Sequence, residues 1–156
     1  MRAPLLAGMA AAALLGAGCG RSAATDAAGV EAASIAWKET FNAGNPAAVT
    51  ALYAEDAVLS APGKPLVRGR VAIGEYLTKT AAEFAAAGLT VTDAPLGAGV
   101  ASGDLGYQWK TYSIADKAGR TVGSGALLTL FRREHGRWLI LADTWNAIET
   151  TVPPVQ

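Results

Sequence analysis

The sequence predicts one α+β domain in which N-terminal helices lie on one face of an antiparallel sheet. Two observations lead to this prediction. Apolar residues recur at helical spacing in the first half of the chain, whereas the second half consists of long strand-like segments separated by turn signals. Residues 30–150 are also long enough to form one hydrophobic core. We therefore expect a single domain over residues 30–150.

Three helices are expected in the first half of the chain. Val30–Ala43 and Arg70–Ala87 carry apolar residues at helical spacing, and Gly88 can end the second of these helices. Asn45 and Pro46 begin a short helix between them, because Asn is a preferred N-cap and Pro is tolerated at the first helical position.

Five strands complete the predicted fold. The first, Ala57–Ala61, follows the acids Glu55 and Asp56 and ends in a Pro-Gly turn. Neighbouring side chains diverge on most backbones, so these two acids form a poor catalytic pair; we expect Asp56 to bond local backbone and Glu55 to be solvated. The other four strands are expected after Gly88, joined by hairpin signals: residues 89–92, 105–114, 121–133 and 138–148.

The first 18 residues have the pattern of an export signal. One Arg precedes an uncharged apolar run that is too short for a comfortable membrane span and ends in small residues. The only cysteine, Cys19, follows Leu-Gly-Ala-Gly, which resembles the lipobox of bacterial lipoproteins, although Gly16 stands where Leu is usual. In such proteins the cysteine is lipidated and becomes the new N-terminus.

This resemblance implies a membrane-anchored lipoprotein of the bacterial cell envelope, attached to the membrane through its lipid alone. Residues 1–18 are then the signal peptide, residues 19–29 a small and polar flexible tether, and residues 151–156 a short tail. The alternative is ordinary cleavage after Ala24, which would give a soluble periplasmic or secreted protein.

The charge pattern excludes several classes of function. The chain has 13 basic and 13 acidic residues; removal of residues 1–18 takes away Arg2 and leaves a net charge of −1. No basic run is present, so nucleic acid is not an expected partner. The only histidine, His135, lies in a predicted hairpin, and with one Cys elsewhere we expect no metal site, no Cys/His nucleophile and no cofactor.

Four segments carry a family resemblance: "FNAGNPAAVTALYAEDAVLSAPG", "VRGRVAIGEYL", "SGDLGYQWKTYSIADKAG" and "LFRREHGRWLILADTWN". In this order they resemble the nuclear transport factor 2-like (NTF2-like) superfamily, also called the SnoaL-like or ketosteroid-isomerase-like fold, and are most similar to a member family of unknown function. The resemblance implies a cone, in which a curved sheet wraps around long helices and encloses a pocket. It implies no chemistry, because this fold hosts enzymes, binding modules and assembly modules.

The ketosteroid isomerases of this superfamily use an Asp base facing a Tyr and a protonated Asp. The corresponding places in this chain are Ala61 for the base, Trp37 for the Tyr and Thr129 for the acidic donor. None of these three side chains can move a proton as that reaction requires. The resemblance therefore argues against ketosteroid isomerase chemistry and weakens the case for an enzyme.

Asp143 is the best candidate for a catalytic residue. It lies in a mostly apolar strand, on the parity of Leu139, Leu141 and Trp145, and a buried carboxylate is costly unless it is paired or bonded. It can serve as a polar contact or base at the pocket. Alternatively it can be a structural partner of Arg132, Arg133, Lys110 or a Tyr.

Aromatic residues indicate a ligand pocket. Tyr and Trp have polar tips that need partners, so a cluster of them suits a pocket wall, whereas Phe84 is expected in the core. Together with Asp143, the expected pocket residues are Trp37, Tyr53, Tyr107, Trp109 and Trp145. The expected ligand is a small apolar or polar-tipped molecule.

Large apolar residues on both parities of "GALLTLF" (residues 125–131) predict that the second sheet face is covered as well. A homodimer is the simplest cover. Three functions remain open: a binding module, an isomerase or dehydratase with Asp143 as general base, and a structural dimer whose cone is filled by side chains.

Overall fold

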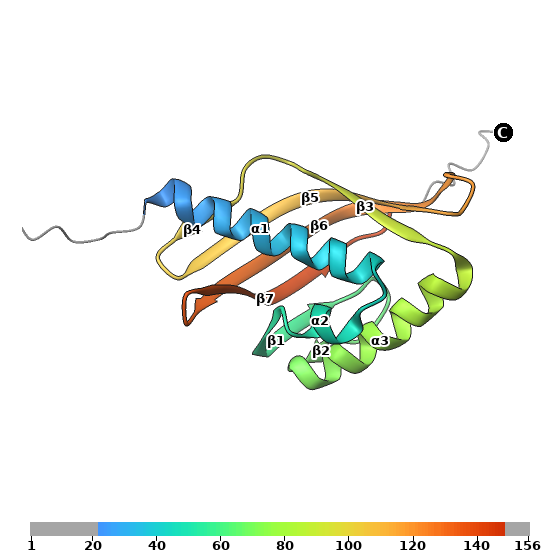
Figure 1. Cartoon of the computed structure of the whole chain (residues 1–156), viewed down its shortest axis with the longest axis horizontal. Coiled ribbons are helices and arrows are strands. Elements are labelled where there is room, and N and C mark those ends of the chain that lie inside the picture. The colour runs from blue at the N-terminus through green and yellow to red at the C-terminus, as the bar shows by residue number, and fades with distance from the viewer. Residues whose placement is uncertain (1–21, 149–156) are drawn as a thin grey trace, which may run out of the picture.

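The computed structural model describes residues 22–148, and within them helices pack on one seven-stranded sheet, which confirms the α+β prediction (Figure 1). The predicted signal peptide, Cys19 and the tail lie outside these residues. The strand order is β2-β1-β7-β6-β5-β3, with β4 paired to β5. The elements are α1 (Ala23–Asn42), α2 (Pro46–Thr50), β1 (Tyr53–Ser60), β2 (Val67–Arg68), α3 (Arg70–Ala87), β3 (Thr90–Pro95), β4 (Val100–Ser102), β5 (Leu105–Ala115), β6 (Thr121–Glu134) and β7 (Arg137–Trp145).

The sheet is antiparallel except at one place. β1 pairs with β7 in parallel, whereas all other neighbours are antiparallel. Parallel neighbours need a long connection, and here α3 and the β3–β6 strands provide it. This single parallel pair corrects the prediction of a wholly antiparallel sheet.

Helix α1 crosses one face of the sheet, where it packs against β3, β4, β5 and β7 (Figure 1). It begins at Ala23, so residues 23–29 are helical and not the flexible tether that their composition suggested. The side chain of Ser22 accepts a hydrogen bond from the Thr25 N–H and caps the helix. A Cβ atom at Gly29 would lie 2.6 Å from the Trp138 side chain. Because glycine has no Cβ, the early turns of α1 can pack closely on the sheet.

The predicted start of α2 and the predicted boundaries of α3 are confirmed. The Asn45 side chain accepts a hydrogen bond from the Ala48 N–H at 3.0 Å, and α3 spans Arg70–Ala87. Gly88 ends α3 at φ +64°, a conformation that glycine adopts without steric strain. Among the described residues, no helix combines the length and the apolar character that crossing a bilayer requires.

Glu55 and Asp56 lie inside β1, because this strand begins at Tyr53 and not at Ala57. Asp56 binds Arg132 of β6 at 2.6 Å, which lowers the pKa of the Asp56 carboxyl, and Glu55 binds Arg70 at 2.6 Å. The two acids therefore hold separate exposed ion pairs. Asp56 is structural as expected, but its partner is a distant arginine in place of local backbone.

Candidate functional site

The sheet and helices α1 and α3 enclose a cavity of about 240 Å³. Its wall is mostly apolar and contains seven aromatic residues: Trp37, Phe41, Tyr76, Phe84, Tyr112, Phe131 and Trp145. The polar side chains in the wall are Ser34, Thr80, Asp93, Lys110, Thr129 and Asp143. An apolar cavity with a few polar groups is the usual form of a small-molecule site.

Aromatic side chains from both long helices form one end of the cavity. Trp37 and Phe41 of α1 stack with ring centroids 4.9 Å apart, and Phe84 of α3 meets Phe41 edge-on at 5.3 Å. Phe84 thus contributes both to the packing between helices, as expected, and to the cavity wall. These contacts fix the position of the Trp37 indole.

A chain of hydrogen bonds connects α1 through β1 to Asp143 on β7. The indole N–H of Trp37 donates to the Tyr53 hydroxyl at 2.9 Å, and that hydroxyl donates to Oδ2 of Asp143 at 3.1 Å. The Thr129 hydroxyl donates to Oδ1 of Asp143 at 3.1 Å. Tyr53 was expected in the pocket wall, but it is fully buried and does not line the cavity; it bonds to Trp37 and Asp143, which do. Of the partners considered for Asp143, a Tyr is the one that binds it.

Burial governs the charge of this group. Asp143 is 8% exposed, and burial raises the pKa of its carboxyl although Thr129, Tyr53 and the charge of Lys110 act in the opposite direction. Burial and the neighbouring carboxylate likewise raise the pKa of the Tyr53 hydroxyl well above 10.0. Asp143 is therefore a carboxyl group that takes up a proton more readily than an exposed Asp.

A β-bulge corrects the predicted faces of β7. Leu130 pairs with Ala142 and Phe131 pairs with Ile140, so Leu141 is an extra residue between two regular pairs. Because the bulge shifts the alternation by one residue, Ile140 lines the cavity together with Asp143 and Trp145. Leu139 and Leu141, which were expected on the face of Asp143, do not line it.

Tyr107 and Trp109 lie outside the cavity, contrary to expectation. They are 41% and 48% exposed, whereas Gln108 and Lys110 between and after them are buried. Gly106 lies on the same face of β5 as Lys110, and a Cβ atom at Gly106 would lie 2.6 Å from the Val30 side chain. Strand β5 therefore turns its glycine face toward α1, and the two aromatic rings point to the opposite side of the sheet.

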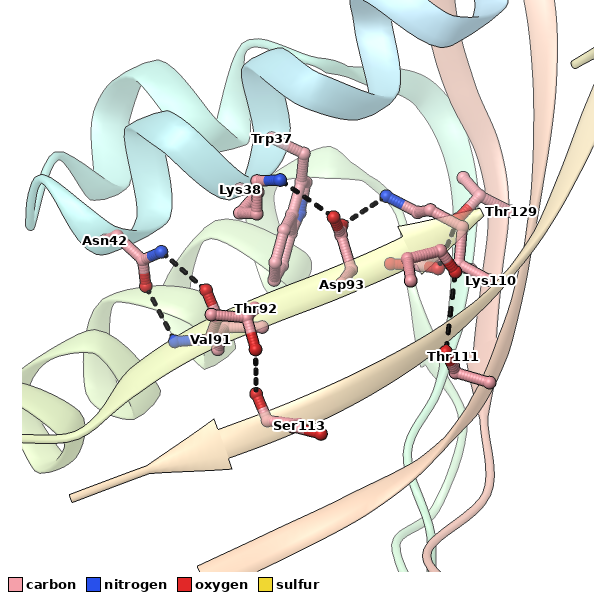
Figure 2. Close-up of polar contacts among 12 residues, drawn as sticks. Trp37, Lys38, Asn42, Val91, Thr92, Asp93, Lys110, Thr111, Ser113 and Thr129 are labelled. Carbon is pink, nitrogen blue, oxygen red and sulfur yellow. Dashed lines mark hydrogen bonds and ion pairs between the residues drawn. The ribbon is translucent and has the colours of Figure 1, made fainter. Parts of the chain in front are cut away.

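A second polar cluster was missed by sequence reasoning (Figure 2). Asp93 of β3 accepts hydrogen bonds from Lys38 of α1 at 2.8 Å and from Lys110 of β5 at 2.5 Å. Burial alone would raise the pKa of Asp93, but the two lysines outweigh it and the pKa is lowered. The available signal was Lys110, which lies within a predicted strand on the face opposite to Tyr107 and Trp109. Asp93 gave no such signal, because the strand before it was expected to end at residue 92.

The places that carry proton transfer in ketosteroid isomerases hold other groups. Ala61 is buried and is not one of the residues that line the cavity, while Thr129 donates to Asp143 and Trp37 donates to Tyr53. His135 lies at the β6–β7 hairpin with φ +49° and is exposed. Residues 22–148 contain no group of three His, Cys, Asp or Glu side chains placed to hold a metal ion.

Comparison with known proteins supports a family assignment. The model of the SnoaL-like domain family matches residues 35–140. A protein named Steroid Delta-isomerase from Nocardioides simplex is 50% identical over 48 residues, which make up 30% of this chain and 39% of that protein. The match thus spans well under half of the isomerase.

Solved structures share the fold at low sequence identity. An NTF2-like protein with a cystatin-like fold from Novosphingobium aromaticivorans has a TM-score of 0.73 at 17% identity, covering 83% of this chain and 86% of that one. A ketosteroid isomerase-like protein from Erwinia carotovora atroseptica gives 0.63 at 24% identity, with 80% and 97% covered. A protein of unknown function from Nostoc punctiforme gives 0.69 at 11% identity, with 81% and 94% covered. With its α+β fold and the match over residues 35–140, the chain belongs to the SnoaL-like domain family.

Proposed function

We propose that this protein is an exported, lipid-anchored binding module that holds a small, mostly apolar, polar-tipped molecule and does not convert it. The observation that carries the proposal is the cavity of about 240 Å³, with aromatic walls and two polar clusters at Asp143 and Asp93. An unfilled apolar cavity costs stability, and a ligand recovers the lost contacts.

The volume limits the size of the ligand. An engineered apolar cavity of about 150 Å³ binds benzene, and pockets for drug-sized ligands begin near about 300 Å³. A cavity of about 240 Å³ therefore suits a molecule of one or two rings, or an aliphatic molecule of similar volume.

Asp143 provides the polar contact in this proposal. Both of its oxygens accept hydrogen bonds, from Tyr53 and Thr129, and each oxygen retains a further lone pair for a donor on the ligand. The position that carries the base in ketosteroid isomerases is Ala61, which offers no proton acceptor. Binding without turnover is the function that these groups support best.

A second function is an isomerase or dehydratase with Asp143 as general base. It is favoured by the burial of Asp143 at the cavity wall and by the raised pKa of its carboxyl, since general bases work best when their pKa approaches the operating pH. The similarity to a steroid Delta-isomerase over 48 residues points in the same direction.

The test is to incubate the purified mature protein with cell extract and with one- and two-ring alcohols, and to identify retained molecules by mass spectrometry. We expect retention, and Asp143→Asn should weaken binding of an alcohol about tenfold in calorimetry, because one acceptor oxygen is replaced by an NH2 donor. The exposed His135→Asn variant serves as the matched control and should bind like the unmodified protein.

Retention of nothing from either source would contradict the proposal. The second function is tested by the absorbance of a conjugated enone formed from a 3-keto-5-ene steroid, and by product analysis of each retained molecule. We expect no steroid isomerisation. Turnover that is lost only in Asp143→Asn would establish the enzyme reading and overturn the binding module.

A further inference from the structure

The cluster of Lys38, Asp93 and Lys110 carries more positive than negative charge. One carboxylate binds two ammonium groups, at 2.8 Å from Lys38 and 2.5 Å from Lys110 (Figure 2). The pKa of Asp93 is lowered, so this carboxyl is ionised at neutral pH. The sum of the three charges is then one surplus positive charge next to the cavity.

Lys110 places the surplus positive charge of this cluster at the cavity wall. Asp93 and Lys110 both line the cavity, whereas Lys38 approaches Asp93 from α1 and remains partly exposed to solvent. The Lys110 side chain is 7% exposed, and within residues 22–148 the acceptor on its ammonium is Asp93 alone. An ammonium group has three donors, so two of them are open to an acceptor inside the cavity.

Asp143 does not supply the missing acceptor as a hydrogen-bond partner. Its two oxygens accept from Tyr53 and Thr129, and Lys110 acts on it only through its charge. Burial nevertheless raises the pKa of Asp143, so its ionised form is less favourable than that of an exposed Asp. A buried ammonium with one bond is costly, and a negative group on a ligand would relieve that cost.

We propose that the molecule bound in the cavity is a monoanion, an aromatic or aliphatic body with a single carboxylate or similar anionic group that accepts hydrogen bonds from Lys110. This inference rests on the proposed binding function and specifies the chemistry of the ligand. The apolar wall around Trp37, Phe41 and Phe84 receives the body of the molecule, and the Asp93 cluster receives its charged end.

The test compares matched probes that differ only in charge: benzoate with benzyl alcohol, and 2-naphthoate with 2-naphthalenemethanol. Affinities are measured by calorimetry on the mature protein. We expect each carboxylate to bind at least about tenfold more tightly than its alcohol, because a hydrogen bond to a charged group is worth more than a neutral one. Equal affinities, or tighter binding of the alcohols, overturn the monoanion proposal and leave the binding module intact.

Three variants test the assignment to this cluster. Lys110→Met and Lys38→Met each leave one lysine facing Asp93, so the surplus positive charge is lost. The affinity of each carboxylate probe divided by that of its alcohol should then fall to near one. Asp93→Asn removes the internal anion, so the preference should rise. A preference that does not change in the lysine variants, or that falls in Asp93→Asn, overturns the proposal.

The lysine variants differ in their demands on folding. Lys38 is partly exposed, and so Lys38→Met keeps the test valid if Lys110→Met does not fold. His135→Asn, on the exposed hairpin, is the control and should keep the full preference. If none of the four probes binds the unmodified protein, the monoanion proposal and the binding function both fail.

Discussion

Asp143 connects β7 to two other strands through hydrogen bonds to one side chain from each. Tyr53 of β1 and Thr129 of β6 donate to its oxygens, and Tyr53 itself receives a bond from Trp37 of α1. Because a buried polar group without a partner is costly, the four side chains fix one another's rotamers. The cavity wall at this point is therefore preorganised, which reduces the entropy that a ligand must lose on binding.

The raised pKa of Asp143 predicts how stability changes with pH. The pKa of its carboxyl is higher in the folded protein than the ordinary value of 3.8, so the folded state keeps this proton to higher pH than the unfolded state. Its contribution is most favourable below pH 3.8 and declines as pH rises through the folded-state pKa. Above the folded-state pKa, the contribution of Asp143 to the free energy of unfolding no longer changes with pH.

The measurement is the free energy of unfolding in urea from about pH 3 to 8, for the unmodified protein and Asp143→Asn. The difference between the two isolates Asp143, since Asp93 and the other acids titrate in both. We expect the advantage of the unmodified protein to shrink as pH rises above 3.8. An advantage that grows with pH would show that Asp143 is ionised and stabilising in the fold.

At the scale of elements, β5 and β6 present an apolar surface on the side of the sheet away from α1. Tyr107 pairs with Leu130 and Trp109 pairs with Leu128, so the four side chains form two adjacent cross-strand pairs. The two aromatic rings are half exposed. Aromatic residues are enriched in interfaces between proteins, where they supply much of the binding energy.

We propose that this surface is the contact between two copies of the chain, related by a two-fold axis. Leu128→Asp should convert the dimer into monomers, because it places a charge in the middle of the contact. Val71→Asp is the matched control, since Val71 is a highly exposed apolar residue on α3. Size-exclusion chromatography with light scattering distinguishes the outcomes. An unmodified protein that is monomeric at micromolar concentration would refute the dimer.

At the scale of the whole molecule, α1 begins only four residues after Cys19 in the sequence, at Ala23. If Cys19 is the lipidated N-terminus, only residues 20–22 separate it from α1. The alternative cleavage after Ala24 would remove Ser22, whose side chain caps the helix and bonds to Thr25. A product processed at Cys19 would retain this cap.

We propose that Cys19 carries the lipid that anchors the protein. In a bacterial host with lipoprotein processing, the protein should incorporate labelled fatty acid and sediment with membranes, and Cys19→Ser should abolish both. Several acyl chains, at about 0.8 kcal/mol for each buried CH₂, are sufficient for stable anchoring. A mature N-terminus at Thr25, determined by mass spectrometry, would contradict the anchor and establish a soluble exported protein.

The sequence by itself determined the order and class of the three helices and of five of the seven strands, together with the start of α2 and the boundaries of α3; it did not indicate β2 or β4. The helix boundaries depend on local chemistry: an Asn that caps a helix, a Pro in its first turn, and a Gly at φ +64° after its last. Local chemistry also gave the hairpin at His135. Trp37, Asp143 and Trp145 could be named as cavity residues because each lies in a periodic apolar segment with a polar group that needs a partner.

The tertiary structure alone decided which face of each strand points inward. Alternation in β5 separates Tyr107 and Trp109 from Lys110 but does not say which set faces α1, and the close approach of Val30 to Gly106 settles it. The bulge at Leu141 exists only through its pairing with β6. The Asp93 cluster unites α1, β3 and β5, so its surplus charge is a property of side chains that the sequence keeps far apart.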